Sequence, residues 1–189
     1  MVVGLRQFRR WTLSGLLELL LAAFNDSGDA NHSLQMIDGT IIRAYHCSTE
    51  VKGGTPRQCL GRSKGGFTTK ILFSINAVGL PLDFALTGGR LSDYKGYLPI
   101  VVDDGPPPKV LLADKGYDAD FIRGDMDKRG GVAIIQTTRK PLVRLPVDAA
   151  IYVMRNMIER NFNKLKNARS LATRYDKTAD GYLGLIHIV

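Results

Sequence analysis

The fold is decided by the stretch Gln35-Met-Ile-Asp-Gly-Thr-Ile-Ile-Arg-Ala-Tyr45. This stretch is rich in β-branched and apolar residues and has the length of a strand, and it carries an acid, Asp38, near its beginning. Two more apolar segments follow at 67–77 and 80–87, and the turn at Val78-Gly79 favours an antiparallel pair beside the first strand. The first half of the chain therefore predicts a sheet with a carboxylate inside one strand.

The second half of the chain alternates between helical and strand-like segments. A short helix is expected at 92–102, because the three consecutive prolines that end at Pro108 exclude helix beyond it. The compact run Lys109-Val-Leu-Leu-Ala-Asp114 predicts a buried strand with a carboxylate at its end, and a helix at 118–129 and a strand at 132–136 follow. The most economical assembly is one α/β domain with a mixed sheet covered by helices.

The segment from Ile151 to Ala168 predicts a helix with two faces. Residues three, four and seven positions apart lie on the same side of an α-helix. One side carries a polar stripe with a single carboxylate, formed by Tyr152, Arg155, Glu159 and Lys166. An apolar stripe that would pack on the core is formed by Ile151, Met154, Ile158, Phe162 and Leu165. Taken singly, each polar residue is better explained as part of an ordinary solvated surface.

The chain carries an excess of positive charge. Its 26 lysines and arginines exceed its 18 aspartates and glutamates, which gives a net charge of +8. The excess is concentrated between Arg155 and Lys177, where the only acids are Glu159 and Asp176. A basic chain with a basic helix favours a polyanionic partner, and nucleic acid is the obvious candidate.

The two cysteines indicate a reducing compartment. Cys47 and Cys59 lie in or beside the Gly-rich stretch 47–66, which we expect to be a loop. Their spacing implies neither a disulfide framework nor a zinc site, so free thiols are expected.

The N-terminal apolar run has two interpretations. Residues 13–24 resemble the core of a secretion signal, but they contain Glu18 and lack a convincing small-residue cleavage site. The run is also too short to span a bilayer. We therefore expect a helix over residues 5–24 in a cytoplasmic protein with no membrane partner, and a signal peptide is the alternative.

Three acids come from segments that can meet at one edge of the predicted sheet: Asp38, Asp114 and Glu159. Hard carboxylate oxygens of this kind hold Mg²⁺ or Mn²⁺. Two such ions can activate an attacking water or hydroxyl and stabilise the leaving oxygen of a phosphodiester. The acids must be distant in sequence, since one strand or helix cannot surround two ions.

Five segments carry longer patterns. They are Met36-Ile-Asp-Gly-Thr-Ile-Ile-Arg43, Leu60-Gly-Arg-Ser-Lys-Gly-Gly-Phe-Thr-Thr-Lys70, Ala113-Asp-Lys-Gly-Tyr-Asp118, Arg155-Asn-Met-Ile-Glu-Arg-Asn-Phe-Asn-Lys-Leu-Lys166 and Ala172-Thr-Arg-Tyr-Asp-Lys177. Together they resemble bacterial insertion-sequence transposases of the DDE class, most closely the insertion-sequence-five family. The resemblance runs from about Phe8 to Val189, and Tyr-x2-Arg-x3-Glu-x6-Lys is the family's signature around its catalytic glutamate.

The resemblance implies an RNase H-like fold and an enzyme that performs DNA transposition by cleavage and strand transfer. Two Mg²⁺ or Mn²⁺ ions would be held by the catalytic residues Asp38, Asp114 and Glu159. The positions expected beside DNA phosphates are Tyr152, Arg155 and Lys166. Lys115 is also expected to face the DNA, with a solvated lysine as the alternative.

The resemblance also implies partners and a domain division. The partners are the DNA of the transposon's terminal inverted repeats and of the target, together with further copies of the chain when it is assembled on DNA at the bacterial nucleoid. Residues 1–30 are expected to be the remnant of an N-terminal helical DNA-binding region, and 33–189 the catalytic domain with a shortened C-terminal helix. A truncated remnant that binds DNA without transposing is the alternative function, and a cellular nuclease of the same fold is a third.

Overall fold

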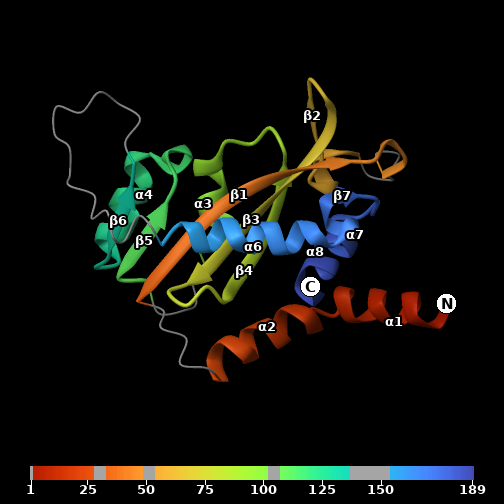
Figure 1. Ribbon diagram of the computed structural model, residues 1–189, viewed down its shortest axis with the longest axis horizontal. Helices are drawn as coiled ribbons and strands as arrows, with labels where there is room; N and C mark the ends of the chain where they lie inside the picture. Colours follow the sequence, from red (N-terminus) through yellow and green to blue (C-terminus); the bar gives the residue numbers. More distant parts are fainter. Residues whose placement is uncertain (1, 28–32, 49–53, 102–106, 137–153) are drawn as a thin grey trace.

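The strands predicted from the sequence form in the computed structural model, which describes residues 2–27, 33–48, 54–101, 107–136 and 154–189 (Figure 1). The described strands are β1 (Leu34–Ala44), β2 (Gly61–Ser63), β3 (Gly66–Asn76), β4 (Pro81–Gly88), β5 (Val110–Ala113), β6 (Val132–Ile135) and β7 (Thr173–Arg174). The prediction of a mixed sheet is thereby confirmed, because these strands build a single seven-stranded sheet with parallel and antiparallel neighbours.

The sheet has β1 at its centre. The main order is β2-β3-β1-β5-β6, with β4 paired to β3 and β7 paired to β1. β1 is antiparallel to β3, from Gln35 opposite Asn76 to Arg43 opposite Thr68. On its other side β1 is parallel to β5, and β5 is parallel to β6. β1 is therefore the strand at which the antiparallel half of the sheet meets the parallel half.

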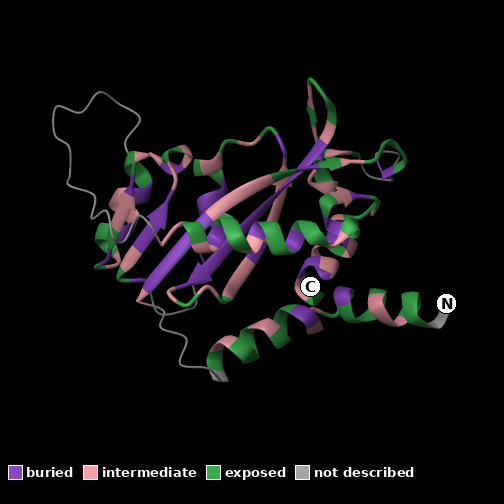
Figure 2. Cartoon of the chain, in the orientation of Figure 1, coloured by how far each residue is buried: buried purple, intermediate pink, exposed green. Residues whose placement is uncertain are grey.

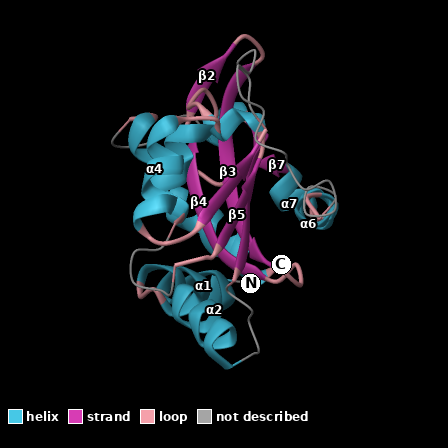
Figure 3. Ribbon diagram, turned by 90° about the vertical axis from the view of Figure 1, so that its left-hand side faces the viewer, coloured by secondary structure: helices cyan, strands magenta, loops and turns pink. Residues whose placement is uncertain are grey.

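Helices cover both faces of the sheet. The described α-helices are α1 (Val2–Leu13), α2 (Leu16–Ser27), α3 (Tyr97–Ile100), α4 (Asp120–Lys128), α6 (Asn156–Asn167), α7 (Arg169–Ala172) and α8 (Ala179–Ile188). Short 3-10 turns are η1 (His46–Ser48), η2 (Pro56–Gln58), η3 (Asp93–Gly96) and η4 (Lys115–Tyr117). Figure 3 shows α4 on one face of the sheet and α6 with α7 on the other.

A buried cluster lies on each face. The cluster under α6 contains Phe73 of β3 and Phe162 of α6, whose ring centroids are 5.8 Å apart. The cluster on the other face contains Ile37 of β1, Leu72 of β3 and Ile122 of α4. Neighbouring residues along a strand point to opposite faces, so a strand covered on both sides is apolar at nearly every position. This explains the continuous apolar run of β5.

The predicted apolar stripe of α6 is confirmed for the part of the helix that the structure describes. Ile158, Phe162 and Leu165 are 1%, 6% and 8% exposed, and the outward side of the helix is exposed (Figure 2). Each fully buried side chain of this size stabilises the fold by roughly 1.5–3 kcal/mol. The described helix begins at Asn156, five residues later than predicted, and 151–153 lie outside the described residues.

The sequence prediction was wrong in places where local geometry decides the structure. Residues 5–24 form two helices, because Gly15 adopts a left-handed backbone with φ of 70° between α1 and α2. The stretch 47–66 was expected to be a loop, but it also contains β2, which pairs with the beginning of β3. The helix expected at 92–102 is reduced to α3, which follows the turn η3.

Two sequence predictions about the chain's chemistry can be compared with the structure. Cys47 and Cys59 are free thiols, as expected. Of the helices that the structure describes, none combines the length and the apolar character needed to cross a bilayer.

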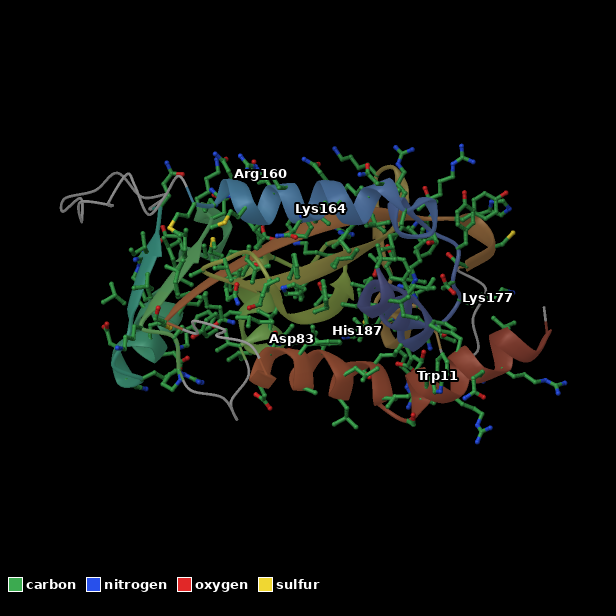
Figure 4. The ribbon with its side chains drawn as sticks, turned by 60° about the horizontal axis from the view of Figure 1, so that its bottom comes forward. Trp11, Asp83, Arg160, Lys164, Lys177 and His187 are labelled. Carbon is green, nitrogen blue, oxygen red and sulfur yellow. The ribbon has the colours of Figure 1, made fainter. Side chains whose placement is uncertain are left out.

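The N-terminal helices pack on the sheet through α2. The side-chain amide of Asn25 donates a hydrogen bond of 3.1 Å to the carbonyl oxygen of Leu82, just before Asp83 of β4. Asp83 and His187 lie where the sheet and α8 face the N-terminal helices (Figure 4). Burial is the main cause that raises the pKa of Asp83 to about 6, and the negative charge of Glu18 raises it as well. A hydrogen bond from the amide of Phe84 acts in the opposite direction and lowers the pKa. An ionised carboxylate at this seam therefore opposes folding.

We predict that Asp83→Asn makes the protein more stable at neutral pH. An acid whose pKa is higher in the folded state loses stability as pH rises through its folded pKa, here about 6. The gain in free energy of unfolding should be near zero at pH 4 and reach about 1–3 kcal/mol at pH 8. Urea unfolding of both proteins at several pH values measures this. Asp26→Asn, at an exposed position of α2, is the matched control, and an equal gain at pH 4 and pH 8 would contradict the prediction.

Candidate active site

The parallel pairing of β1 with β5 brings two of the predicted acids together. Ile37 of β1 is in register with Ala113 of β5. The next residue along each strand is an aspartate, Asp38 and Asp114, so the two carboxyl groups lie at neighbouring positions. Asp38 lies within β1, whereas Asp114 follows the end of β5 and caps η4 by accepting a hydrogen bond of 2.6 Å from the amide of Lys115.

Arg155 lies between the two acids. Its guanidinium nitrogens are 3.7 Å from Asp38 Oδ2 and 3.3 Å from Asp114 Oδ1. The Arg155 side chain is only 13% exposed, compared with 18% for Asp38 and 35% for Asp114. A guanidinium can reach two carboxylates at once because its donors are spread over a planar fork. The described site is therefore a partly buried cluster with two negative charges and one positive charge.

The carboxyl group of Asp38 is strongly perturbed by its surroundings. Burial raises the pKa of Asp38 to about 6. A 2.7 Å hydrogen bond from the amide of Gly39 and the positive charge of Arg155 lower the pKa, while the negative charges of Asp114 and Asp93 raise it. Perturbation by burial together with specific charged neighbours is typical of functional sites.

The other predicted residues lie around this pair. Glu159 is exposed on α6, four residues after Arg155, and these two positions share one side of the helix. Lys166 is exposed further along the same helix, and Lys115 is exposed beside Asp114. Tyr152 lies outside the described residues. The structure thus brings Asp38, Asp114 and Arg155 into contact and leaves the side chain of Glu159 at the surface.

Two groups near the acids were not singled out from the sequence. Tyr117 is fully buried, and its hydroxyl has no hydrogen-bond partner among the described residues. Burial raises its pKa, as do the negative charges of Asp38, Asp93 and Asp114. Asp93 of η3 pairs with Lys70 of β3 at 2.6 Å. Lys70 and Tyr117 stand in segments of the family resemblance, but nothing in the spacing assigns them a position near Asp38.

The residues present fit a divalent metal ion. Asp38 and Asp114 offer hard oxygen ligands at adjacent positions. The buried Tyr117 hydroxyl near them has no hydrogen-bond partner in the part of the chain that the structure describes. Within the described part of the chain, no three side chains of the histidine, cysteine, aspartate and glutamate types gather closely enough to hold a metal. The two aspartates alone form the described core of the candidate site.

The chain is basic, and its mixed sheet brings two carboxylates together beside a helix rich in cations. These features are typical of enzymes that act on the phosphodiesters of nucleic acids. The family described as Transposase DDE domain matches residues 29–186, which is most of the chain. The chain belongs to this family of DDE transposases, and its mixed sheet with flanking helices has the architecture expected from the sequence. The chain thus belongs to a class of enzymes that cleave and transfer DNA strands.

Two relatives support the assignment to bacterial insertion sequences. A Brucella ovis protein named as a transposase for insertion sequence element IS6501 is 32% identical to the chain over 124 residues, which cover 64% of this chain and 93% of that protein. A Burkholderia cepacia protein named as a transposase for element IS402 is 29% identical to the chain over 116 residues, which cover 56% of this chain and 52% of that protein. The chain spans about half the length of this second relative.

Solved structures of transposases also resemble the chain. The piggyBac transposase synaptic complex with hairpin DNA has a TM-score of 0.44 at 10% identity and covers 82% of this chain and 45% of its own. The catalytic domain of Mos1 mariner transposase has a TM-score of 0.34 at 12% identity and covers 96% of this chain and 87% of its own. At these identities and TM-scores, the solved structures assign no role to any residue of this chain.

We predict that Arg155→Met tightens the binding of Mn²⁺ in the absence of DNA. The guanidinium and a divalent cation compete for the same carboxylate oxygens, and methionine keeps much of the side-chain volume without the charge. Titration calorimetry should show a dissociation constant lower by about threefold to tenfold. Lys166→Met removes a cation from the exposed side of the same helix and serves as the control. Unchanged or weaker binding in Arg155→Met would rule out this competition.

Proposed function

We propose that the chain is the catalytic part of an insertion-sequence-five type transposase that uses two Mg²⁺ or Mn²⁺ ions held by Asp38, Asp114 and Glu159. The observation that carries this proposal is the placement of Asp38 and Asp114 at neighbouring positions of two parallel strands, where both reach Arg155. Glu159 completes the set because it follows Arg155 by one helical turn, and Arg155 already touches both aspartates.

The metal ions, when bound, would activate the attacking water or 3′-hydroxyl and stabilise the leaving oxygen. The chain's own residues hold the ions and the substrate. Asp38 lies in β1 and Asp114 follows directly after β5, so the sheet places the backbones of the two acids at neighbouring positions. Arg155 neutralises the paired acids and lies at the end of α6 that is nearest to them.

The DNA would lie along the exposed side of α6. Arg160 and Lys164 project from the outer surface of this helix (Figure 4), and Lys166 is exposed on it as well. Such side chains hold phosphates by charge and by hydrogen bonds, without reading base sequence. Lys115 would add a cation beside Asp114, and Arg155 would lie at the end of α6 nearest the acids. A phosphate contact is proposed for Tyr152 as well, which is outside the described residues. The DNA substrates are the terminal inverted repeats and the target.

The remaining proposals concern the organisation of the protein. Residues 33–189 would form the catalytic domain, and residues 1–30 would belong to a helical region that takes part in DNA binding. The exposed basic side chains of Arg6, Arg9 and Arg10 on α1 favour this second assignment. Assembly of several copies would bring two transposon ends together.

Replacing either aspartate should abolish catalysis while leaving DNA binding in place. Asp38→Asn and Asp114→Asn keep the side-chain shape but remove a charged metal ligand, so Mg²⁺-dependent nicking of DNA that carries the element's ends should fall by about a thousandfold. A gel assay of end cleavage measures this. Asp127→Asn, an exposed position on α4, should leave the rate unchanged.

Two outcomes would decide against the proposed function. Cleavage that survives unchanged in Asp114→Asn would remove that residue from the site. DNA binding by the wild-type chain with no cleavage in either Mg²⁺ or Mn²⁺ would instead support the alternative of a DNA-binding remnant.

The phosphate contacts of α6 make a separate prediction about salt dependence. Each phosphate neutralised by a lysine releases counterions, so Lys166→Ala should weaken DNA binding and lower the slope of log K against log salt by about one. Fluorescence anisotropy at a series of salt concentrations measures the slope. Lys128→Ala, on α4 across the sheet from α6 (Figure 3), should leave it unchanged. An equal change of slope in both variants would mean that α6 is not the DNA surface.

A further inference from the structure

An ion pair with a buried lysine lies beneath the two acids, on the face of the sheet away from α6. Lys70 Nζ is 2.6 Å from Asp93 Oδ1 and also donates a hydrogen bond to the carbonyl oxygen of Leu91. The Lys70 side chain is 6% exposed, whereas that of Asp93 is 39% exposed. A lysine on a central strand is rarely buried to this degree unless it is paired. Lys70 shares its side of β3 with Leu72, which belongs to the core cluster of α4.

The lysine end of this pair lies against the backbone that follows Asp38. A Cβ atom placed on Gly39 would be 3.3 Å from Lys70 Cδ and 3.1 Å from Leu72 Cδ2. The side chain of Lys70 therefore passes β1 at Gly39 so closely that a Cβ atom there would be in a tighter contact than most. The amide of Gly39 in turn donates the hydrogen bond of 2.7 Å to Asp38 Oδ1. Lys70 thus packs against the residue whose amide binds the first acid.

The aspartate end of the pair lies against the turn that follows Asp114. A Cβ atom on Gly116 would be 2.5 Å from Asp93 Oδ2 and 3.0 Å from Asp93 Cβ. Gly116 is the middle residue of η4, whose first residue, Lys115, donates its amide to Asp114. The carboxylate that binds Lys70 with one oxygen therefore rests with the other oxygen on the turn that orients the second acid.

We propose that Lys70 and Asp93 are positioning residues that hold Asp38 and Asp114 at the separation needed to bind a divalent metal ion. The inference rests on the proposed function, since it assumes that these acids are the ligands. Neither member of the pair touches the metal or the DNA. Each acts through a neighbouring glycine, and the ion pair connects the two supports into one unit.

The sign of the effect separates this role from simple electrostatics. Removal of a nearby positive charge by itself makes a site more attractive to a cation, as expected for Arg155→Met. Lys70→Met also removes a positive charge, but it releases Asp93 and with it the support of both acids. Positioning therefore predicts weaker binding of metal, the opposite of the electrostatic expectation.

The test measures Mn²⁺ binding to the full chain by calorimetry in the absence of DNA, well below the unfolding temperature. Lys70→Met should weaken Mn²⁺ binding at least threefold and reduce Mn²⁺-dependent cleavage, while DNA affinity in a chelator stays unchanged. Arg129→Met breaks a more exposed ion pair, that of Arg129 with Asp125 at 2.8 Å at the C-terminal end of α4, and should change none of these quantities.

A second pair of variants tests the contact at Gly116 and also serves if Lys70→Met does not fold. Gly116→Ala should weaken Mn²⁺ binding because its methyl group displaces the carboxylate of Asp93. In an Asp93→Ala background, where that carboxylate is gone, the same alanine should have little additional effect. Non-additivity of this kind identifies residues that act as one unit.

The outcomes are distinguishable from a failure of the proposed function. If the wild-type chain binds no Mn²⁺, the metal assignment itself is wrong and the positioning role is overturned with it. If the wild type binds Mn²⁺ but Lys70→Met binds it equally well or more tightly, only the positioning role is overturned. The same holds if Gly116→Ala and Asp93→Ala weaken binding additively.

Discussion

Two like charges at adjacent positions on parallel strands are the constraint on which the rest of the site depends. The register of β1 and β5 places Asp38 beside Asp114 in a partly buried setting, where their repulsion is less screened than in water. Such an arrangement needs a compensating cation, and Arg155 from a distant part of the chain supplies one. Arg155 therefore adds an electrostatic attraction to the apolar packing that places α6 across the sheet.

The two faces of the sheet contribute to the site in different ways. The face under α6 brings the charged groups that contact the acids. The opposite face carries the support, since Lys70 and Asp93 touch the glycines that follow Asp38 and precede Tyr117. Because Gly39 and Gly116 have no side chain, Lys70 and Asp93 can approach the backbone itself. In the proposed role they support the acids from the face of α4 and leave the face of α6 free.

Periodic apolar patterns predicted most of the fold because burial follows directly from them. The strand around Asp38 and the buried stripe of α6 are examples. The sequence could also place Asp114 at the end of its strand. It could not predict that Gly15 would divide one helix into two, because a glycine is compatible with either structure. Nor could it place Asp93 near Asp114, since that proximity results from long-range contacts between two short turns that have no periodicity.

The amphipathic helix α6 has a consequence for how this chain can vary during evolution. Its buried residues Ile158, Phe162 and Leu165 fix the rotation of the helix about its own axis. A substitution on the exposed side leaves that rotation unchanged, but one residue inserted between Arg155 and Ile158 would turn Arg155 by about 100° relative to the buried stripe. Related chains should therefore differ freely in the identity of surface residues along α6, yet keep the number of residues between Arg155 and the core of the helix constant.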